Sequence, residues 1–194
     1  MRTVRKASMQ IRKNDGMSIT KPNSNYYEQS SDRLLFRSLT LEDIQLWIPF
    51  FNKEDYHRFL GQDTSTPGSE RAKVWIERQI QRKNEGTYGQ LAIIEKSSGK
   101  FMGVGGIIHR ELYGNDDLEI TYSLLPEFWG KGYARELAQH FIDYAKDETE
   151  VTSVMSMIHP ENEASKNVAL ANGLTFDRMA KFMSIPVEVY RLKF

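Results

Sequence analysis

Two glycines flank a lysine in the run PEFWGKGYARE, which spans residues 126–136. The run follows a strand-like stretch and precedes a stretch with helical periodicity, so it marks a strand-to-helix turn. The first N–H groups of a helix lack partners within the helix and carry partial positive charge. Glycine lets the main chain approach an anion closely and adopt positive φ. An anion-binding site is therefore predicted at the main-chain N–H groups of Gly130, Lys131, Gly132, Tyr133 and Ala134.

A plain turn is the alternative to a ligand site, and the spacing alone leaves it open. The run lacks both the G-x-x-x-x-G-K-[ST] pattern and the G-x-G-x-x-G spacing of nucleotide sites. The preceding strand, residues 120–125, adds a second feature. If this strand diverges from its neighbour, its free N–H and C=O groups can pair with an extended, amide-bearing ligand. Pro126 cannot donate to a strand ladder and marks where the pairing ends.

Composition narrows the class of protein. The chain has 194 residues, of which 40% are hydrophobic, so it can bury a real core. Lysine plus arginine equals aspartate plus glutamate at 26 each, which gives no basic surplus for nucleic acid. The absence of cysteine excludes disulfides and thiolate chemistry, and it fits a reducing cytoplasm. No apolar run approaches the roughly 20 residues of a membrane span, so no membrane association is expected.

The first 31 residues are expected to be a flexible extension, because they are basic at the start and then rich in Asn, Ser and Asp. A transit peptide is the alternative interpretation of the basic start. The remaining residues, 32–194, are expected to form one domain. Oligomeric state is left as monomer or homodimer.

Periodicity predicts a mixed α/β sheet. Strands are expected over residues 33–37, 90–96, 101–112, 118–125 and 151–158, with one or two more over 174–194. Helices are expected from residue 40, over 69–83, from the glycine turn to about 146, and over 162–172. The glycine turn therefore joins the third strand of an antiparallel set to a long helix.

Two runs resemble the GNAT superfamily of acetyl-CoA-dependent N-acyltransferases, and within it the ribosomal-protein N-terminal acetyltransferases. They are LEITYSLLPEFWGKGYARELAQHFIDYA and ENEASKNVALANGLTF. The resemblance implies the GNAT fold, an α/β (α+β) architecture with a mixed, mostly antiparallel sheet of six to seven strands flanked by about four helices. It implies an enzyme that uses acetyl-CoA as co-substrate and a primary amine, on a peptide N-terminus or a small molecule, as acceptor.

The resemblance also implies roles for individual residues. Trp129 stands where the superfamily motif has Gln or Arg, a departure that is usual in the resembled subgroup. The main-chain amides of the motif would hold the CoA pyrophosphate, and Asn162 would bond the pantetheine arm or a nearby water. Main-chain groups for the pantetheine arm would come from Tyr122, Ser123 and Leu124.

Catalysis needs a neutral amine and release of a thiolate, and two side chains are candidates for these tasks. Glu119 would act as the general base, directly or through a water, and Ser165 would donate a hydrogen bond to the sulfur. Many superfamily members place an acidic tyrosine where this chain has Ala169. That departure favours the alternative of a CoA-binding regulatory protein without turnover. Glu119 could also be a strand residue paired with a cation, and Asn162 a helix N-cap.

Other groups carry weaker signals. The four histidines show no zinc-site spacing, so no metal is expected. His159 is expected to be a solvated loop residue, and a position facing the cofactor is the alternative. Val74 and Trp75 are expected in the core. A core or lid role and a substrate role stay equally open for the aromatic group Trp47, Phe50, Phe51, Tyr56 and Phe59.

Overall fold

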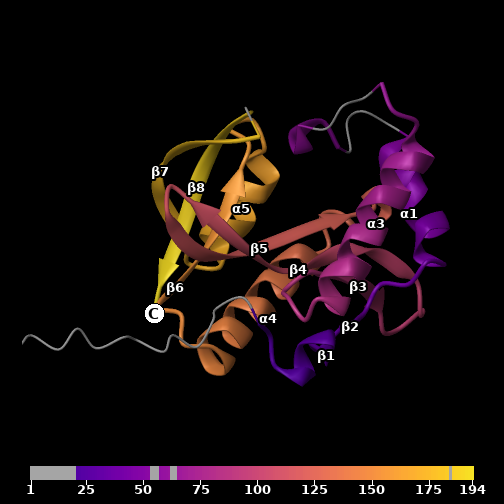
Figure 1. The fold of residues 1–194 in the computed structure, drawn as a ribbon, viewed down its shortest axis with the longest axis horizontal. Coiled ribbons are helices and arrows are strands. Elements are labelled where there is room, and N and C mark those ends of the chain that lie inside the picture. Colours follow the sequence, from indigo (N-terminus) through magenta and orange to yellow (C-terminus); the bar gives the residue numbers. More distant parts are fainter. Residues whose placement is uncertain (1–20, 53–56, 62–64, 184) are drawn as a thin grey trace, which may run out of the picture.

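The computed structural model describes residues 21–52, 57–61, 65–183 and 185–194, and within them one eight-stranded sheet is flanked by helices (Figure 1). In chain order the strands are β1 (Glu28–Ser30), β2 (Leu34–Arg37), β3 (Gln90–Glu95), β4 (Phe101–Leu112), β5 (Asn115–Leu124), β6 (Ser153–Ile158), β7 (Thr175–Phe182) and β8 (Ile185–Lys193). The α-helices are α1 (Asp43–Phe51), α3 (Gly68–Asn84), α4 (Tyr133–Glu148) and α5 (Glu163–Ala171). Short 3-10 turns are η1 (Ser24–Tyr27), η2 (Arg58–Leu60) and η3 (Pro126–Phe128).

The strands lie in the order β1-β2-β3-β4-β5-β6-β8-β7. Every neighbouring pair is antiparallel except β5 and β6, which run parallel. The expected mixed, mostly antiparallel sheet is therefore confirmed. It has eight strands, one or two more than expected, because β1 adds to one edge and the C-terminal stretch folds into both β7 and β8.

The sheet opens between the parallel strands β5 and β6. A single register pair, Glu119 with Met155, joins the two strands. By contrast, β4 and β5 pair along ten positions, from Gly103–Leu124 to Leu112–Asn115. The part of β5 that follows Glu119 therefore keeps one partner strand and diverges from the other, as the sequence suggested.

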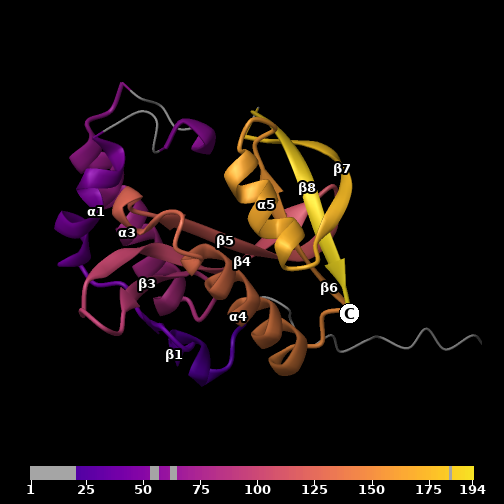
Figure 2. The ribbon, with the colours of Figure 1, turned by 180° about the vertical axis from the view of Figure 1, so that it is seen from behind.

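Two helices cover opposite faces of the sheet. Figures 1 and 2, seen from opposite sides, show α3 in front of the strands in one view and α4 in front in the other. The apolar stripe of α4 is buried, with Leu137 and Phe141 fully inaccessible, as its periodicity predicts. The sheet and these helices share one large core cluster, and a smaller cluster lies under β7 and β8.

The N-terminal segment differs from the expected flexible extension in its last residues. Tyr26 of η1 is 0% exposed, and its hydroxyl donates to the Gly89 carbonyl at 2.6 Å and accepts from the Ile107 N–H at 2.7 Å. Burial raises the pKa of Tyr26 well above its usual value. β1 then pairs with β2. The ordered fold therefore includes residues before 32, because an aromatic side chain in a polar-looking stretch reaches the core; residues 1–20 lie outside the described part.

Candidate active site

The turn between β5 and α4 has the backbone that its glycines predict. Gly130 and Gly132 have φ values of 71° and 78°, a region that other residues enter at a cost. A Cβ at Gly130 would meet nothing within 4 Å, and at Gly132 only an Arg33 nitrogen at 3.6 Å. The glycines are thus needed for conformation, and space outside the turn is open.

The main-chain N–H groups of residues 130–135 have no hydrogen-bond partner among the described residues, while the Glu136 N–H already bonds the Gly132 carbonyl at 3.1 Å. Unpaired N–H groups at a helix N-terminus, facing open space, form a site for an anion. The turn therefore fits a phosphate group of an external ligand.

Arg33 lies beside this turn, and no sequence pattern predicted a role for it there. Its Nη1 donates to the Lys131 carbonyl at 3.0 Å, and its Nε pairs with Glu136 at 2.6 Å. The guanidinium lies 4.3 Å from the Tyr133 ring centroid. Because 98 residues separate Arg33 from Lys131, only the fold brings this positive charge to the turn.

The main chain of β5 alternates between its two neighbours. A Cβ added at Gly105 would lie 3.0 Å from the Thr121 carbonyl oxygen, so this oxygen faces β4. The Ile120 carbonyl instead accepts from Ser156 Oγ of β6 at 2.9 Å, and the Leu124 carbonyl accepts from Trp129 Nε1 at 2.7 Å. Strand alternation therefore turns the N–H and C=O of Tyr122 toward the opening between β5 and β6. The Leu124 carbonyl already has one protein donor.

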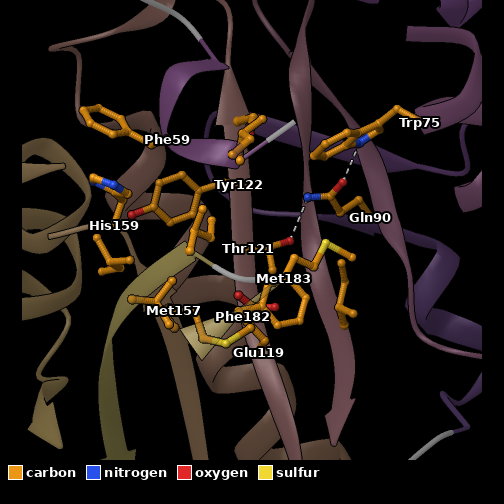
Figure 3. Close-up of a pocket in the computed structure, with 18 of the residues that line it drawn as sticks. Phe59, Trp75, Gln90, Glu119, Thr121, Tyr122, Met157, His159, Phe182 and Met183 are labelled. Atoms are coloured by element: carbon orange, nitrogen blue, oxygen red, sulfur yellow. Dashed lines mark hydrogen bonds between the residues drawn. The ribbon is translucent and has the colours of Figure 1, made fainter. Parts of the chain in front are cut away.

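A cavity of about 590 Å³ lies beside this opening (Figure 3). Its walls come from η2, α3, β3, β4, β5, β6, the start of α5 and the tip of the β7–β8 hairpin. Among the residues predicted for the site, the cavity wall includes Glu119, Tyr122, Ser123, Asn162 and Ser165. The turn residues 129–134 and Leu124 lie outside this wall, so the turn and the cavity are two neighbouring regions.

Glu119 is buried in the cavity wall, with its side chain 7% exposed. Its Oε2 accepts from Arg110 Nε at 2.6 Å, and the Arg110 guanidinium lies 4.6 Å from the Phe182 ring centroid. The expected alternative of a paired strand glutamate is thus present. The pairing uses one carboxylate oxygen, and Oε1 has no partner among the described residues.

Tyr122 and Ser165 come together across the opening. The Tyr122 side chain points toward His159 (Figure 3), and Ser165 borders the same cavity. Burial raises the pKa of Tyr122 to about 12, and the nearby Ser165 side chain acts in the opposite direction. A phenol therefore lies in the same cavity wall as Ser165, whereas Ala169 does not border the cavity.

Asn162 is the N-cap of α5, because its Oδ1 accepts from the Ser165 N–H at 3.2 Å. Its side chain also borders the cavity, so the cap and a ligand contact are compatible.

His159 differs from the expected solvated residue. It borders the cavity, its ring centroid lies 5.2 Å from that of Phe59, and its Nδ1 accepts from the Glu161 N–H at 3.2 Å.

A hydrogen-bonded chain forms the opposite wall. Trp75 Nε1 donates to Gln90 Oε1, and Gln90 Nε2 donates to Thr121 Oγ1, both at 2.8 Å (Figure 3). Trp75 is therefore a wall residue as well as a packed one. Val74 was expected in the core, but it is 59% exposed at the cavity edge, because α3 turns this side away from the sheet.

The aromatic group divides between core and cavity. Trp47, Phe50 and Phe51 are buried in the core, while Phe59 borders the cavity. Tyr56 lies outside the described residues. The described part of the chain contains no group of three or more side chains arranged to hold a metal ion. Among the same residues, no helix has both the length and the hydrophobicity to cross a membrane.

Comparison with known protein sequences identifies a matching family and related proteins. Residues 33–175 match the acetyltransferase (GNAT) domain family. The chain is 33% identical over 166 residues to YkkB of Bacillus subtilis, a match that covers 84% of this chain and 94% of YkkB. It is 28% identical over 150 residues to an N-acetyltransferase called p20 of Bacillus licheniformis, which covers 76% of this chain and 81% of p20.

Solved structures share the fold. A GNAT acetyltransferase of Bacillus anthracis superposes with a TM-score of 0.70 at 18% identity, covering 84% of this chain and 96% of its own. RimL, a ribosomal L7/L12 α-N-protein acetyltransferase in complex with coenzyme A, gives 0.66 at 18% identity and covers 85% and 96%. Spermidine N-acetyltransferase of Vibrio cholerae, in complex with CoA and spermine, gives 0.67 at 15% identity and covers 84% and 96%.

Proposed function

The chain belongs to the GNAT acetyltransferase family, and from this premise we propose that its acceptor is a primary amine that attacks the acetyl thioester directly. It is an acetyl-CoA-dependent N-acetyltransferase. Whether the amine is a peptide N-terminus or part of a small molecule is not fixed by the fold. The observation that carries the proposal is the opening between β5 and β6, which meets unpaired N–H groups at the start of α4.

The coenzyme is held mainly by main chain in this proposal. The N–H groups of residues 130–134 bind the pyrophosphate, and Lys131 and Arg33 add positive charge nearby. The exposed edge of β5, above all the N–H and C=O of Tyr122, pairs with the amides of the pantetheine arm. Asn162 contributes its side-chain amide nitrogen, because its oxygen is used by the helix cap.

The amine nitrogen then attacks the thioester carbonyl carbon. A C–N bond forms, the C–S bond breaks, and CoA leaves as a thiolate. The nitrogen loses one proton, which Glu119 accepts at its unpaired Oε1, directly or through a water. Arg110 fixes the orientation of this carboxylate through Oε2. An α-amino group, with an ordinary pKa of about 8, needs less help than a lysine near 10.4.

The thiolate needs a hydrogen-bond donor, and the cavity offers two hydroxyls. Ser165 and Tyr122 both border the cavity, so either hydroxyl can donate to the sulfur. Because burial raises the pKa of Tyr122, its phenol stays protonated at neutral pH. It can donate a hydrogen bond without giving up its proton outright.

Two measurements test the function separately. Coenzyme binding is tested by thermal unfolding, because a ligand at 100 times its Kd stabilises by about 2.7 kcal/mol. Turnover is tested by thiol release from acetyl-CoA with an acceptor panel of N-terminal peptides, amino acids, polyamines and aminoglycosides. Stabilisation together with thiol release from at least one amine supports the proposal. Stabilisation without thiol release from any of them would identify a CoA-binding protein instead.

A further inference from the structure

Helix α3 turns a stripe of arginines toward the cavity. Arg71, Arg78 and Arg82 are spaced by seven and four residues, which places them on one helical face. All three border the cavity, and so do the residues between them on the same face, Val74, Trp75 and Gln79. Nothing in the proposed chemistry of acetyl transfer uses these three guanidinium groups.

The two arginines toward the end of the stripe have no carboxylate partner among the described residues. Arg82 donates to the Gln79 amide oxygen at 3.3 Å, and no bond within these residues holds Arg78. Arg71 differs, because its Nη2 donates to the Phe51 carbonyl at 3.1 Å and its guanidinium lies 5.1 Å from the Phe51 ring centroid. Arg71 is thus anchored, whereas Arg78 and Arg82 present charge to the cavity.

The charged side chains around the described cavity wall are unbalanced. Four arginines, Arg71, Arg78, Arg82 and Arg110, face only two glutamates, Glu70 and Glu119. Glu119 is already paired with Arg110. Burial, with Arg78 and Arg110 close by, lowers the pKa of Arg82 to about 10. A partly buried cation next to other cations is a costly arrangement, and an anion bound among them would relieve it.

We propose that the acceptor is a small amine that also carries a carboxylate or phosphate group, with its anion bound by Arg78 and Arg82 and its amine directed to Glu119. The proposal rests on the acetyl-transfer function proposed above. Guanidinium groups suit both anions, because their planar donors match two oxygens at once. Arg82 is linked to β5 through Gln79 and Gln90. Gln90 donates to Thr121, two residues from Glu119 on the same face of the strand. The anion and the amine of the acceptor therefore need to be only a few bonds apart.

The cavity also argues against other acceptors. Its volume of about 590 Å³ is in the range of small-molecule sites. A polyamine would bring further positive charge against unpaired arginines, which costs binding energy. The positive charge of the arginine stripe therefore disfavours a polyamine such as spermidine as the acceptor.

The test compares four amines of similar length that differ in the second group. They are 4-aminobutyrate, 2-aminoethyl phosphate, 4-aminobutanamide and 1,4-diaminobutane, each assayed by thiol release from acetyl-CoA. We expect kcat/KM for one of the two anionic amines to exceed that for the carboxamide at least tenfold, with the diamine lowest. The carboxylate and phosphate arms show which anion is preferred. Equal rates for the carboxamide or the diamine would overturn the proposal.

Variants then assign the effect to the stripe. Arg82→Gln and Arg78→Gln should each reduce the ratio of kcat/KM for the preferred anionic amine to that for the carboxamide at least fivefold, through a higher KM for the anionic amine. Lys73→Gln removes one positive charge from an exposed position of the same helix and should change nothing. An unchanged preference in both arginine variants would overturn the assignment.

Binding separates this inference from the function itself. Calorimetry with the CoA-loaded protein measures affinity for 4-aminobutyrate and 2-aminoethyl phosphate without turnover. Arginine-dependent binding without thiol release would contradict the proposed function and keep the anion site. Thiol release with the carboxamide, together with no binding preference for anions, would do the reverse.

Discussion

The proposed coenzyme side and the proposed acceptor side of this molecule differ in composition, because the first is formed by main chain and the second by side chains. The coenzyme side is main chain, with two positive-φ glycines, unpaired N–H groups and the free edge of one strand. Its parts come from the contiguous stretch 120–134. The acceptor side is made of side chains that reach one cavity from η2, α3, several strands and the β7–β8 hairpin.

This difference determines what each side can recognise. Main-chain N–H groups can bind a phosphate or an amide wherever the backbone has a suitable conformation. The side chains around them can therefore vary without loss of binding. Side chains around a cavity set size and charge, so they decide which acceptor fits. A fold shared with RimL and with a spermidine N-acetyltransferase is therefore compatible with an acceptor of a third kind.

The largest predicted effect breaks the coenzyme side. Gly132→Glu places a carboxylate at the turn, where the added Cβ meets only an Arg33 nitrogen at 3.6 Å, and the new negative charge repels a phosphate. Like charges brought together cost several kcal/mol, so the affinity for CoA should fall by at least about 100-fold. Isothermal titration with CoA measures the loss, which should be the same for every acceptor assayed.

Gly86→Glu is the matched control for that change. Gly86 has a φ of 67°, and a Cβ there meets nothing within 4 Å, whereas one at Gly132 meets only the Arg33 Nη2 at 3.6 Å. Both substitutions should lower the free energy of unfolding by about 1–2 kcal/mol, the cost of a left-handed non-glycine residue. Only the one at Gly132 should weaken CoA binding, and equal CoA affinity in the two variants would contradict the turn as the phosphate site.

The second prediction acts where the two sides meet. Glu119→Gln keeps the shape of the side chain and an acceptor for Arg110 but removes the base, so kcat/KM should fall about 100-fold or more. CoA affinity should stay within twofold. The loss should be largest at pH values below the pKa of the acceptor amine, where the amine must first lose a proton. Steady-state rates across pH, with denaturant unfolding as a check on stability, measure both.

Glu111→Gln is the control, because Glu111 is an exposed residue of the neighbouring strand β4. It should change neither the rate nor its pH profile. A rate defect of Glu119→Gln that is independent of pH would show that Glu119 positions Arg110 and is not the base.

The features that could be predicted from the sequence lie mostly on the coenzyme side. Residues 120–134 form a local pattern in which each feature has a local cause, so the sheet opening, the glycine conformations and the free N–H groups could all be expected. The fold class followed from strand and helix periods. Tyr26 could not be expected, because its burial depends on β3 and β4, which lie more than sixty residues away.

The residues of the acceptor side could not be predicted for a related reason, because their roles depend on contacts between distant parts of the chain. Arg78 and Arg82 are ordinary on the surface of an amphipathic helix, and their spacing becomes a signal only once the helix is known to face a cavity. Val74 was expected to be buried for its hydrophobicity alone, but the sheet packs against another side of α3. Arg33 reaches the turn only through the pairing of distant segments.

A third prediction examines the two hydroxyls between the sides. Tyr122→Phe and Ser165→Ala should each lower kcat about tenfold, because each removes one member of a pair that can donate to the leaving thiolate. CoA affinity should be unchanged for Tyr122→Phe, since the proposed pantetheine contact is main chain. The double variant should lose little more than either single one, as expected for groups that act as a unit. Multiplied effects would instead assign them separate roles.

The smallest predicted effect is electrostatic. Arg33→Gln removes a charge that is held beside the turn by Lys131 and Glu136 but is 47% exposed on its side chain. A partly solvated charge contributes at most about 1 kcal/mol, so CoA affinity should fall about three- to fivefold at low salt and less at high salt. Lys146→Gln, an exposed charge in the last turn of the same helix α4, should leave CoA affinity unchanged. If Arg33→Gln weakened CoA binding equally at low and high salt, the residue would act by supporting the shape of the turn rather than by its charge.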